Sequence, residues 1–479
     1  MPLIKSISGI RGTLGDAPGE NLTKTDVIKF TAAFASLLKE KNWGDLIILG
    51  RDARPSGQSF RDLIIKTLLS LNFRVTDLGL VATPTVEMAV IYEKAAGGII
   101  ITASHNPIEW NALKLLNSNG EFLSREDGER VLKLADKQDQ KMVDKILNAD
   151  INLISDSRNL IINNDYGQRH IAKILKLKLV DPAAIKKVNF KIVVDGINSV
   201  GGLIIPELLK ALGVDQVIKL NCEPNGQFVH NPEPLEKNLQ GISSLVVQKK
   251  ADIGIVVDPD VDRLAFVSED GTMFGEEYTL VAVADYVLKN YSPCYYQKIS
   301  VSNLSSSRAL KDVSERHGGS YEAAAVGEIN VVAKMKEAKA VIGGEGNGGV
   351  ILPGLHYGRD ALVGVALFLS ALAQSEQKIS KFRRNFPEYF MVKDKLELTP
   401  NIDVSALLGY LKDEYKKPEY QADKITDIDG IKIDFPKYWL HLRASNTEPI
   451  IRIYGEAKDW NLLNDKISKI KSKILAYIK

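Results

Sequence analysis

The chain has 479 residues, of which 45% are hydrophobic and 25% are charged, as is typical of folded multidomain proteins. Its 62 lysines and arginines nearly balance 60 acidic residues, so the net charge of +2 gives no overall field that would favour nucleic acid or a membrane surface. Two cysteines exclude a disulfide framework and a multi-cysteine zinc site. Because we find neither a signal-peptide core nor a run of roughly 18 apolar residues, we expect a cytoplasmic protein.

Short apolar runs alternate with helical patterns over most of the chain. The runs that we interpret as buried strands span residues 46–50, 98–102, 191–195, 253–257, 299–302 and 340–343. Apolar residues at helical spacing occupy, among others, residues 59–71, 203–212 and 362–373. This alternation predicts repeated α/β units whose strands are buried and mostly parallel.

The C-terminal part follows a different pattern. Residues 431–435, 439–443 and 450–454 alternate apolar and polar side chains, which predicts half-exposed antiparallel strands. A helical pattern starts at about Trp460. The basic segment Lys378–Pro387 ends in a proline, and we predict that it is a linker leading into this smaller domain.

Polar segments and changes of strand pattern set the expected domain boundaries. Residues 133–158 are rich in charge, and we interpret them as a helix and a connector that close the first domain. The pattern changes phase again near Asp270 and Gly271. We therefore expect three similar mixed-sheet α/β domains and a C-terminal α+β domain, at residues 1–158, 159–267, 268–385 and 386–479.

Ser104 lies in a turn directly after the apolar run Gly97–Thr102. A serine at the mouth of a buried strand is well placed to be a nucleophile or a phosphate carrier. A free hydroxyl is a weak nucleophile, so it needs a neighbouring base or cation. His105 and Lys114, together with Asn106, are candidates to supply hydrogen bonds or proton transfer. The alternative is a polar turn whose side chains only satisfy the backbone.

Asp258, Asp260 and Asp262 follow another apolar run at alternate positions. Alternate side chains of an extended loop project to one side, so the three carboxylates can converge on one hard divalent cation. Without a cation they would repel one another strongly. An exposed acidic turn is the plain alternative.

Two other known types of site that contain aspartates agree poorly with this loop. An EF-hand fails because Arg263 stands where the sixth position requires glycine, and because the flanks have strand patterns. A phosphatase of the haloacid-dehalogenase type normally places its aspartate near the first strand of its domain, with a Thr or Val pattern that is missing here.

Gly344–Gly349 formally matches the dinucleotide motif G-x-G-x-x-G, but Pro353 follows where that motif needs a helix. We interpret the segment as a loop that approaches a ligand, with Glu345 and Asn347 facing sugar hydroxyls. A tight turn between strands is the alternative. No Walker A sequence occurs, which argues against a P-loop ATPase.

Arg443–Pro449 gathers a guanidinium, two hydroxyls and an amide in one short turn, with Arg452 on the next predicted strand. Such a group can surround a phosphate, although a plain polar hairpin is the alternative. Two glycine-flanked basic loops, Ser8–Gly12 and Gly50–Gly57, are either surface loops or further approaches to a phosphate.

Together these motifs resemble the α-D-phosphohexomutase superfamily, in the expected order over nearly the whole chain. The matching segments are its N-terminal signature at Ser8–Gly12, phosphoserine loop at Thr102–Pro107, magnesium loop at Asp258–Arg263, sugar loop at Gly344–Gly349 and phosphate loop at Arg443–Pro449. The resemblance implies four domains around a central cleft, with a loop from each.

The resemblance also implies a reaction. Phosphorylated Ser104 would give its phosphoryl group to a hexose monophosphate, and the resulting hexose 1,6-bisphosphate would turn around and return its other phosphate. The implied catalytic residues are Ser104, Arg11, His105, Lys114 and Arg263. The implied Mg²⁺ ligands are Ser104, Asp258, Asp260 and Asp262. The implied substrate-binding residues are Gly327, Glu345, Asn347, Arg443, Ser445, Asn446, Thr447 and Arg452.

The sequence departs from the commoner bacterial pattern of this family. The sugar loop often reads Gly-Glu-x-Ser-Gly-His, whereas Asn347 and Gly349 stand here for the serine and histidine, which removes one acid–base group, although His356 is close in sequence. Ala444 replaces the usual proline of the phosphate loop. This form looks most like the archaeal-type phosphoglucosamine mutases.

We therefore expect a small-molecule partner, glucosamine 6-phosphate, converted to glucosamine 1-phosphate, and neither nucleic acid nor a membrane. Phosphomannomutase/phosphoglucomutase activity is the alternative. A phosphatase, and a non-catalytic metal- or sugar-binding protein that has kept the fold, are more remote ones.

Overall fold

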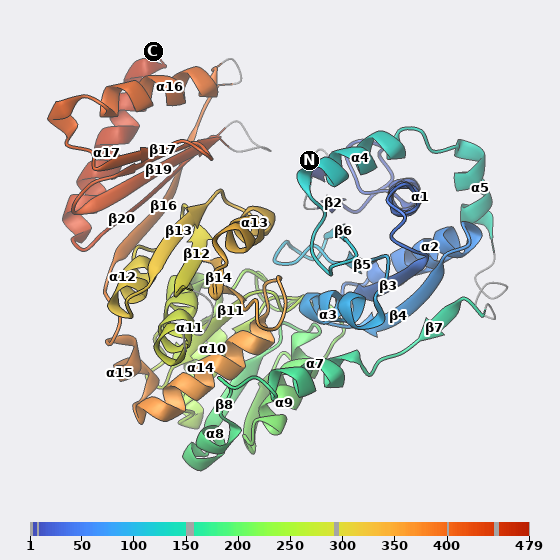
Figure 1. The fold of residues 1–479 in the computed structure, drawn as a ribbon, viewed down its shortest axis with the longest axis horizontal. Coiled ribbons are helices and arrows are strands. Elements are labelled where there is room, and N and C mark those ends of the chain that lie inside the picture. The colour runs from blue at the N-terminus through green and yellow to red at the C-terminus, as the bar shows by residue number, and fades with distance from the viewer. Residues whose placement is uncertain are drawn as a thin grey trace. The chain divides into compact units, whose positions relative to one another are not determined.

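The computed structural model of the chain describes residues 3–6, 9–149, 158–291, 297–399, 402–444 and 450–478 (Figure 1). They form two compact units, one comprising Met1–Thr279 and Asn347–Arg383, the other Leu280–Gly346 and Arg384–Lys479. Three α/β domains and a C-terminal domain with an antiparallel sheet follow one another along the chain, which confirms the predicted fold class. Among the described residues, no helix has both the length and the apolarity that crossing a membrane requires.

The described part of the first domain contains a seven-stranded mixed sheet. In spatial order its strands are β1 (Ile4–Ser6), β2 (Gly9–Thr13), β6 (Trp110–Leu116), β5 (Gly97–Ile101), β3 (Leu46–Arg51), β4 (Arg74–Leu80) and β7 (Leu160–Ile162). From β5 to β7 neighbouring strands are parallel, whereas β1, β2, β6 and β5 pair antiparallel.

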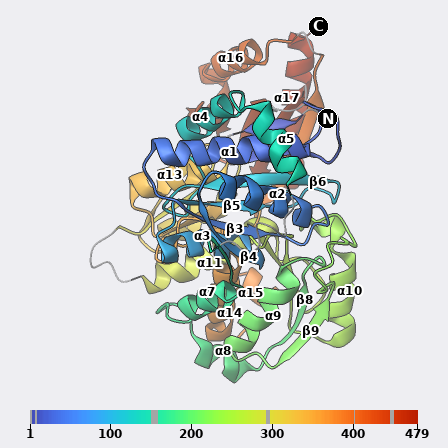
Figure 2. The same cartoon turned by 90° about the vertical axis from the view of Figure 1, so that its right-hand side faces the viewer.

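Helices cover both faces of this first sheet (Figure 2). They include α1 (Lys24–Glu40), α2 (Gly57–Ser70), α3 (Thr83–Glu93), α4 (Arg125–Ala135) and α5 (Gln140–Asn148). Successive side chains of a strand point to opposite faces of its sheet. Ile47 and Leu49 of β3 accordingly pack with α1, α2, α4 and α5, while Ile48 packs with α3.

The second domain belongs to the same unit and is built on a sheet with the order β11–β10–β8–β9. Its elements are α7 (Tyr166–Ile174), α8 (Pro182–Val188), β8 (Lys191–Asp195), α9 (Gly201–Ala211), β9 (Gln216–Leu220), η1 (Glu236–Asn238), α10 (Gln240–Lys249), β10 (Ile253–Val257) and β11 (Leu264–Ser268). Figure 2 shows α9 and α10 on opposite sides of β8 and β9. β10 and β11 pair antiparallel, so the predicted aspartate loop joins the two strands of a hairpin.

Three further elements complete the first unit: β15 (Gly349–Ile351), α14 (Ala361–Ser375) and α15 (Ile379–Arg383). The predicted linker Lys378–Pro387 therefore begins as a helix. Its apolar residues Ile379 and Phe382 are buried, because they face one side of a helical turn. Phe382 joins a cluster of aromatic rings in which Phe266 and Phe368 stack with centroids 3.8 Å apart.

The second unit contains the parallel strands of the third domain, in the order β13–β12–β14. The elements are β12 (Ile299–Asn303), α12 (Ala309–Arg316), β13 (Ser320–Ala324), α13 (Glu328–Ala338) and β14 (Ile342–Glu345). The helix α11 (Glu276–Asn290) precedes them in the chain and carries the boundary between the two units.

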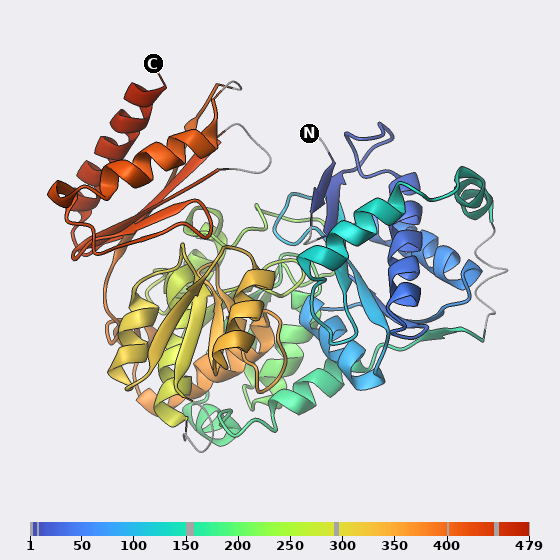
Figure 3. The same cartoon turned by 45° about the horizontal axis from the view of Figure 1, so that its top comes forward.

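The C-terminal domain has an antiparallel sheet in the order β16–β20–β19–β18–β17. Its elements are β16 (Phe390–Glu397), α16 (Val404–Tyr415), η2 (Pro418–Tyr420), β17 (Lys424–Thr426), β18 (Ile431–Asp434), β19 (Tyr438–Ala444), β20 (Ile450–Ala457) and α17 (Trp460–Tyr477). α16 and α17 lie on one face of this sheet (Figure 3). Their apolar sides pack on alternate strand residues such as Leu440 and Ile453. The expected antiparallel strands and final helix are thus observed.

Candidate functional site

The serine turn begins where β5 ends, at Ile101. Ser104 is buried and has a left-handed backbone conformation with φ of 49°, which is uncommon for a residue with a side chain. Its backbone N–H donates to Thr102 Oγ1 at 2.9 Å, and the Thr102 hydroxyl donates to Asp52 Oδ2 at 2.7 Å. The local conformation of Ser104 is therefore fixed by a chain of buried hydrogen bonds.

Arg54 holds the same turn from inside the protein. Its guanidinium is fully buried and donates to the carbonyl oxygens of Ser104 and Asn106, each at 2.6 Å. It also donates to the carbonyl oxygens of Pro107 and Trp110, at 2.5 and 3.0 Å. From the sequence we interpret the segment Gly50–Gly57 either as a surface loop or as a phosphate contact. Arg54 instead binds the backbone from inside the protein. The spacing of residues in the sequence does not reveal which backbone carbonyls a buried guanidinium reaches.

The three loop aspartates are completely buried and converge, with one carboxylate oxygen of each within 4.8 Å of the others. Ser104 Oγ donates to Asp258 Oδ2 at 2.6 Å, so the structure brings the serine and the acidic hairpin together. The other oxygen of Asp258 accepts the backbone N–H groups of Asp262 and Arg263, both at 3.1 Å. These bonds bend the hairpin back on itself.

Two cations and a hydroxyl lie against the other aspartates. Lys114 Nζ donates to Asp260 Oδ2 at 2.6 Å and to Asp262 Oδ2 at 3.1 Å. Arg359 Nη2 donates to Asp262 Oδ2 at 2.8 Å, and Thr83 Oγ1 donates to Asp260 Oδ2 at 2.6 Å. Sequence reasoning missed Arg359 and Thr83, which belong to no recognised motif.

Burial and mutual repulsion set the charges of these carboxylates. Burial, followed by repulsion from Asp262 and Asp260, raises the pKa of Asp258 well above its usual value. Burial also opposes the charge of Asp262, but Arg359 and Lys114 outweigh it and hold the pKa of that carboxyl well below its usual range. Burial likewise opposes the charge of Lys114, yet Asp260 and Asp262 raise its pKa.

The acidic hairpin fits a magnesium ion. Asp260 Oδ1 and Asp262 Oδ1 are buried and have no hydrogen-bond partner among the described residues. Leaving such oxygens unpaired is costly in a protein interior. Magnesium prefers carboxylate and other oxygen ligands, so these atoms, together with Asp258 and the hydroxyl of Ser104, form a suitable donor set.

The remaining predicted catalytic residues lie near the serine turn. Arg11 Nη1 donates to Asn106 Oδ1 at 2.9 Å, and burial followed by repulsion from Arg263 lowers the pKa of Arg11. Burial, then the charges of Arg263 and Arg11, lowers the pKa of His105 well below its usual value, so its ring is neutral. Arg263 Nη1 donates to Glu233 Oε1 at 3.4 Å.

The presence of glycine instead of histidine at position 349 has a steric explanation. A Cβ at Gly349 would lie 2.4 Å from Arg359 Cδ and 3.2 Å from Asn347 Oδ1. The space that a side chain at 349 needs is thus occupied by the arginine that binds Asp262. The neighbouring Asn347 Oδ1 accepts the backbone N–H of Gly349 at 3.3 Å. His356 does not compensate for the absent histidine, because it is buried against Glu87 and Asp360.

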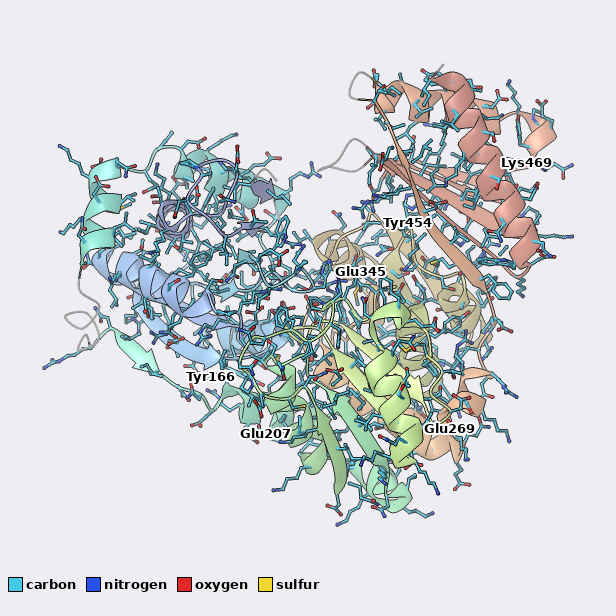
Figure 4. The ribbon with its side chains drawn as sticks, turned by 180° about the vertical axis from the view of Figure 1, so that it is seen from behind. Tyr166, Glu207, Glu269, Glu345, Tyr454 and Lys469 are labelled. Atoms are coloured by element: carbon cyan, nitrogen blue, oxygen red, sulfur yellow. The ribbon has the colours of Figure 1, made fainter. Side chains whose placement is uncertain are left out.

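The second unit holds the predicted sugar contacts Glu345 and Gly327. Glu345, labelled in Figure 4, ends β14 and accepts the side-chain amide of Asn303 at 2.9 Å. The same oxygen accepts the backbone N–H of Gly327 at 3.0 Å. Gly327 has φ of 109°, which a side chain would strain, and it caps the N-terminus of α13.

Arg443 and Arg452 stand directly opposite each other on β19 and β20. Like charges at opposed strand positions are destabilising, so this pair is suited to an anion. Asp429 Oδ2 offsets part of the charge, because it lies 2.9 Å from Arg443 Nε. The predicted phosphate ligands Ser445, Asn446 and Thr447 lie outside the described residues.

Comparisons with known proteins cover nearly the whole chain. Four sequence profiles match it, described as phosphoglucomutase/phosphomannomutase alpha/beta/alpha domain I (residues 4–142), domain II (168–271), domain III (275–390) and C-terminal domain (394–467).

Individual relatives match over nearly their full length. A protein of Thermococcus kodakarensis named phosphoglucomutase/phosphomannomutase is 36% identical, over 94% of this chain and 93% of its own. A phosphoglucosamine/phosphogalactosamine mutase of Sulfurisphaera tokodaii is 30% identical, over 97% of each. The crystal structure of a phosphoglucomutase/phosphomannomutase family protein of Burkholderia thailandensis superposes with a TM-score of 0.80 and 25% identity, covering 99% of this chain and 98% of that one.

Proposed function

This chain belongs to the phosphoglucomutase/phosphomannomutase family, and on that basis we propose that it moves phosphate between the 6- and 1-positions of a hexose phosphate, with Ser104 as the phosphate carrier. The observation that carries the proposal is the 2.6 Å hydrogen bond from Ser104 Oγ to Asp258 Oδ2. It joins the hydroxyl of Ser104 to a buried acidic hairpin in the same unit.

The proposed reaction consists of two phosphoryl transfers. In the first, the bond between phosphorus and Ser104 Oγ breaks and a bond from phosphorus to a free sugar hydroxyl forms. The hydroxyl proton leaves to a base, and Ser104 Oγ takes up a proton. The hexose 1,6-bisphosphate then turns around, and its other phosphate returns to Ser104 by the reverse transfer. The sum is an isomerisation that consumes no phosphate.

The chain supplies charge and orientation at the serine. In this proposal Asp258, Asp260 and Asp262 hold Mg²⁺, which when bound offsets the negative charge of the transferring phosphoryl group. Lys114 is bonded to Asp260 and Asp262, so we assign it a charge role, shared with Arg11 and Arg263. His105 Nδ1 has no hydrogen-bond partner in the described structure, and we assign it proton exchange with the sugar.

The second unit supplies contacts away from the reacting centre. We assign the non-reacting phosphate to Arg443 and Arg452, which stand opposite each other on neighbouring strands, together with Ser445, Asn446 and Thr447. Sugar hydroxyls are assigned to Glu345 and Gly327 of that unit and to Asn347 of the first unit. A bisphosphate intermediate needs two phosphate sites, and this division provides them.

Two substrate pairs are candidates. Glucosamine 6-phosphate and glucosamine 1-phosphate are our first choice, because the loop Gly344–Gly349 resembles archaeal-type phosphoglucosamine mutases and the Sulfurisphaera relative is named for that activity. Glucose and mannose phosphates are the second choice, favoured by the name of the Thermococcus relative at 36% identity.

A steady-state assay tests the proposal. We expect isomerised sugar phosphate from the wild type, no measurable turnover from Ser104→Ala, and full activity from the control Ser59→Ala, which removes an exposed serine of α2. Comparing kcat/KM for glucosamine, glucose and mannose phosphates ranks the substrates. Undiminished activity in Ser104→Ala would refute the covalent mechanism, and release of free phosphate instead of an isomer would identify a phosphatase.

A further inference from the structure

A second buried group of metal-ligating side chains lies in the first unit, apart from the serine turn. We call it the histidine cluster, and it consists of His170, His356 and Asp360. His170 Nε2 lies 3.0 Å from Asp360 Oδ2, and His356 Nε2 lies 3.3 Å from the same oxygen. All three side chains are almost completely excluded from solvent.

These distances match the edges of a tetrahedral metal site. Zinc binds imidazole nitrogen and carboxylate oxygen at about 2.0–2.1 Å, so two ligands of one tetrahedral ion lie about 3.3 Å apart. The two measured separations in the histidine cluster, 3.0 and 3.3 Å, are close to that value. Imidazole ligands also suit zinc far better than magnesium, which distinguishes this group from the acidic hairpin.

The outer atom of each ligand is held by a separate partner. His170 Nδ1 lies 3.0 Å from the hydroxyl of Thr85, and His356 Nδ1 lies 3.2 Å from Glu87 Oε2. Asp360 Oδ1 accepts the backbone N–H groups of residues 362 and 363 at the start of α14, at 2.8 and 3.3 Å. Metal-bound histidines characteristically donate their second nitrogen to an outer partner, which fixes the ring. The Thr85 hydroxyl is placed for this at His170, whereas the contact of His356 with Glu87 has an ion-pair distance without hydrogen-bond geometry.

The backbone is also adapted to the contact between Glu87 and His356. A Cβ at position 358 would lie 1.8 Å from Glu87 Oε2, so only Gly358 allows this carboxylate to reach the ring. Glu87 lies on α3, His170 on α7, and Asp360 caps α14; α7 contacts both other helices (Figure 1). An ion in the cluster would therefore connect α7 with the start of α14, and the contact of His356 with Glu87 would extend this connection to α3.

We propose that His170, His356 and Asp360 bind a structural Zn²⁺ ion, with water as the fourth ligand. The ion is incorporated during folding, because the cluster is closed to solvent. It fixes the start of α14 and hence the neighbouring Arg359, whose guanidinium reaches Asp262. The zinc site is separate from the proposed magnesium site and has no part in the chemistry of the serine.

Metal analysis of the purified full-length chain, expressed without a histidine tag in zinc-containing medium, tests the proposal. We expect a single zinc ion per chain, retained through gel filtration and lost in His356→Gln and His170→Gln. The matched control Asp258→Asn, in the acidic hairpin, retains its zinc. Zinc that persists in both histidine variants would overturn the assignment, because the ion would then be bound elsewhere.

Refolding the wild-type chain keeps the test independent of whether the variants fold. The chain is unfolded in denaturant that contains a chelator. It is then refolded with Zn²⁺, with Co²⁺ or without metal. Zinc should raise Tm, since an ion that binds only the folded state stabilises it, and Co²⁺ should give the visible bands of a tetrahedral complex. A wild-type protein that refolds to the same Tm without metal and takes up neither ion would refute the zinc site. The proposed mutase activity would stand in that case, because isomerisation of the sugar phosphate and the effect of Ser104→Ala are measured separately.

Discussion

At the scale of single residues, Arg54 stands out because it acts on the backbone of the serine turn rather than on a ligand. Ser104 has a left-handed conformation that costs energy for a residue with a side chain. Four carbonyl oxygens of the turn accept hydrogen bonds from the Arg54 guanidinium, and Asp52 Oδ2 accepts from its Nε at 3.0 Å. This fork of donors compensates the strain and fixes the position of the hydroxyl.

We therefore predict that Arg54→Lys lowers kcat. Lysine keeps a positive charge beside Asp52 but cannot donate to four carbonyls in a plane. A small misplacement of a reacting group costs about 100-fold in rate, so we expect a loss in kcat of that order with a much smaller change in KM. Arg51→Lys, in the same segment, is the control. Equal kcat values for the two variants would show that Arg54 does not position Ser104.

Arg54→Ala tests the same contact through stability. Removing the guanidinium leaves the carboxylate of Asp52 buried without its partner, because both side chains are fully buried. Breaking such a pair costs about 3–5 kcal/mol of folding free energy. Urea unfolding should show a large decrease in midpoint, and a decrease no greater than that of Arg51→Ala would contradict the structural role of this pair.

At the scale of elements, the hairpin of β10 and β11 concentrates three buried carboxylates in one turn. Lys114, Arg359 and Arg263 lie against these carboxylates, yet two carboxylate oxygens are left without hydrogen-bond partners in the described structure. Such a turn is more favourable with a bound dication than without one.

Removal of the metal should therefore abolish activity reversibly. We expect EDTA to stop turnover and added Mg²⁺ to restore it, because the charge of the transferring phosphoryl group is then compensated again. Asp260→Asn removes one ligand charge and should raise the Mg²⁺ concentration needed for half-maximal activity. Steady-state rates across a Mg²⁺ titration measure both effects. Robust turnover in thoroughly chelated enzyme would contradict the role given to the hairpin.

Most elements could be predicted from the sequence. Apolar runs such as Lys191–Asp195 and Ile253–Val257 form strands with those bounds, because buried parallel strands need continuous apolar side chains. The prediction of a linker at Lys378–Pro387 is wrong for its first part. Ile379 and Phe382 are apolar at helical spacing, but the aromatic cluster that buries Phe382 is contributed by distant parts of the chain.

The site is predictable where chemistry is concentrated in one motif. Ser104 and the aspartates can be found because unusual residue types follow buried strands. The roles of Arg54, Arg359 and the histidine cluster cannot be found in this way. Their partners are backbone carbonyls or side chains far away in the sequence, and none of these residues belongs to a recognised motif. The steric reason for Gly349 likewise needs the position of Arg359.

At the scale of the whole molecule, the described parts of the third and fourth domains are joined through the buried ring of His441. Its Nδ1 lies 2.9 Å from Ser305 Oγ, and its Nε2 lies 2.8 Å from the carbonyl oxygen of Asp429. Burial, followed by the charges of Lys432 and Arg443, lowers the pKa of His441 to about 4. The ring is therefore neutral, with Nε2–H donating to the carbonyl.

This neutral histidine predicts acid sensitivity of the second unit. Its pKa is lower in the folded state than the ordinary value of about 6.5, so its contribution to stability is complete above pH 6.5 and is lost as pH falls to 4. A lowering of the pKa by this amount corresponds to a loss of about 3 kcal/mol at most in the free energy of unfolding. The urea midpoint followed by tryptophan fluorescence should fall over this range in the wild type and fall less in His441→Gln.

His230→Gln is a matched control of opposite sign. Burial opposes the charge of His230, but its hydrogen bond with Asp195 raises its pKa, so this histidine adds stability at low pH that is lost as pH rises through the folded pKa. Removing it should make the acid sensitivity steeper. A His441→Gln profile identical to that of the wild type would show that the junction does not depend on this ring.

Phosphate must pass through Ser104 if the chain works as proposed. The most direct measurement is mass spectrometry of the protein before and after brief incubation with glucose 1,6-bisphosphate, and again after addition of a hexose 6-phosphate. We predict one added phosphate on the peptide that contains Ser104, followed by its loss as bisphosphorylated sugar forms. Catalytic turnover by protein that never carries phosphate on Ser104 would contradict the central claim.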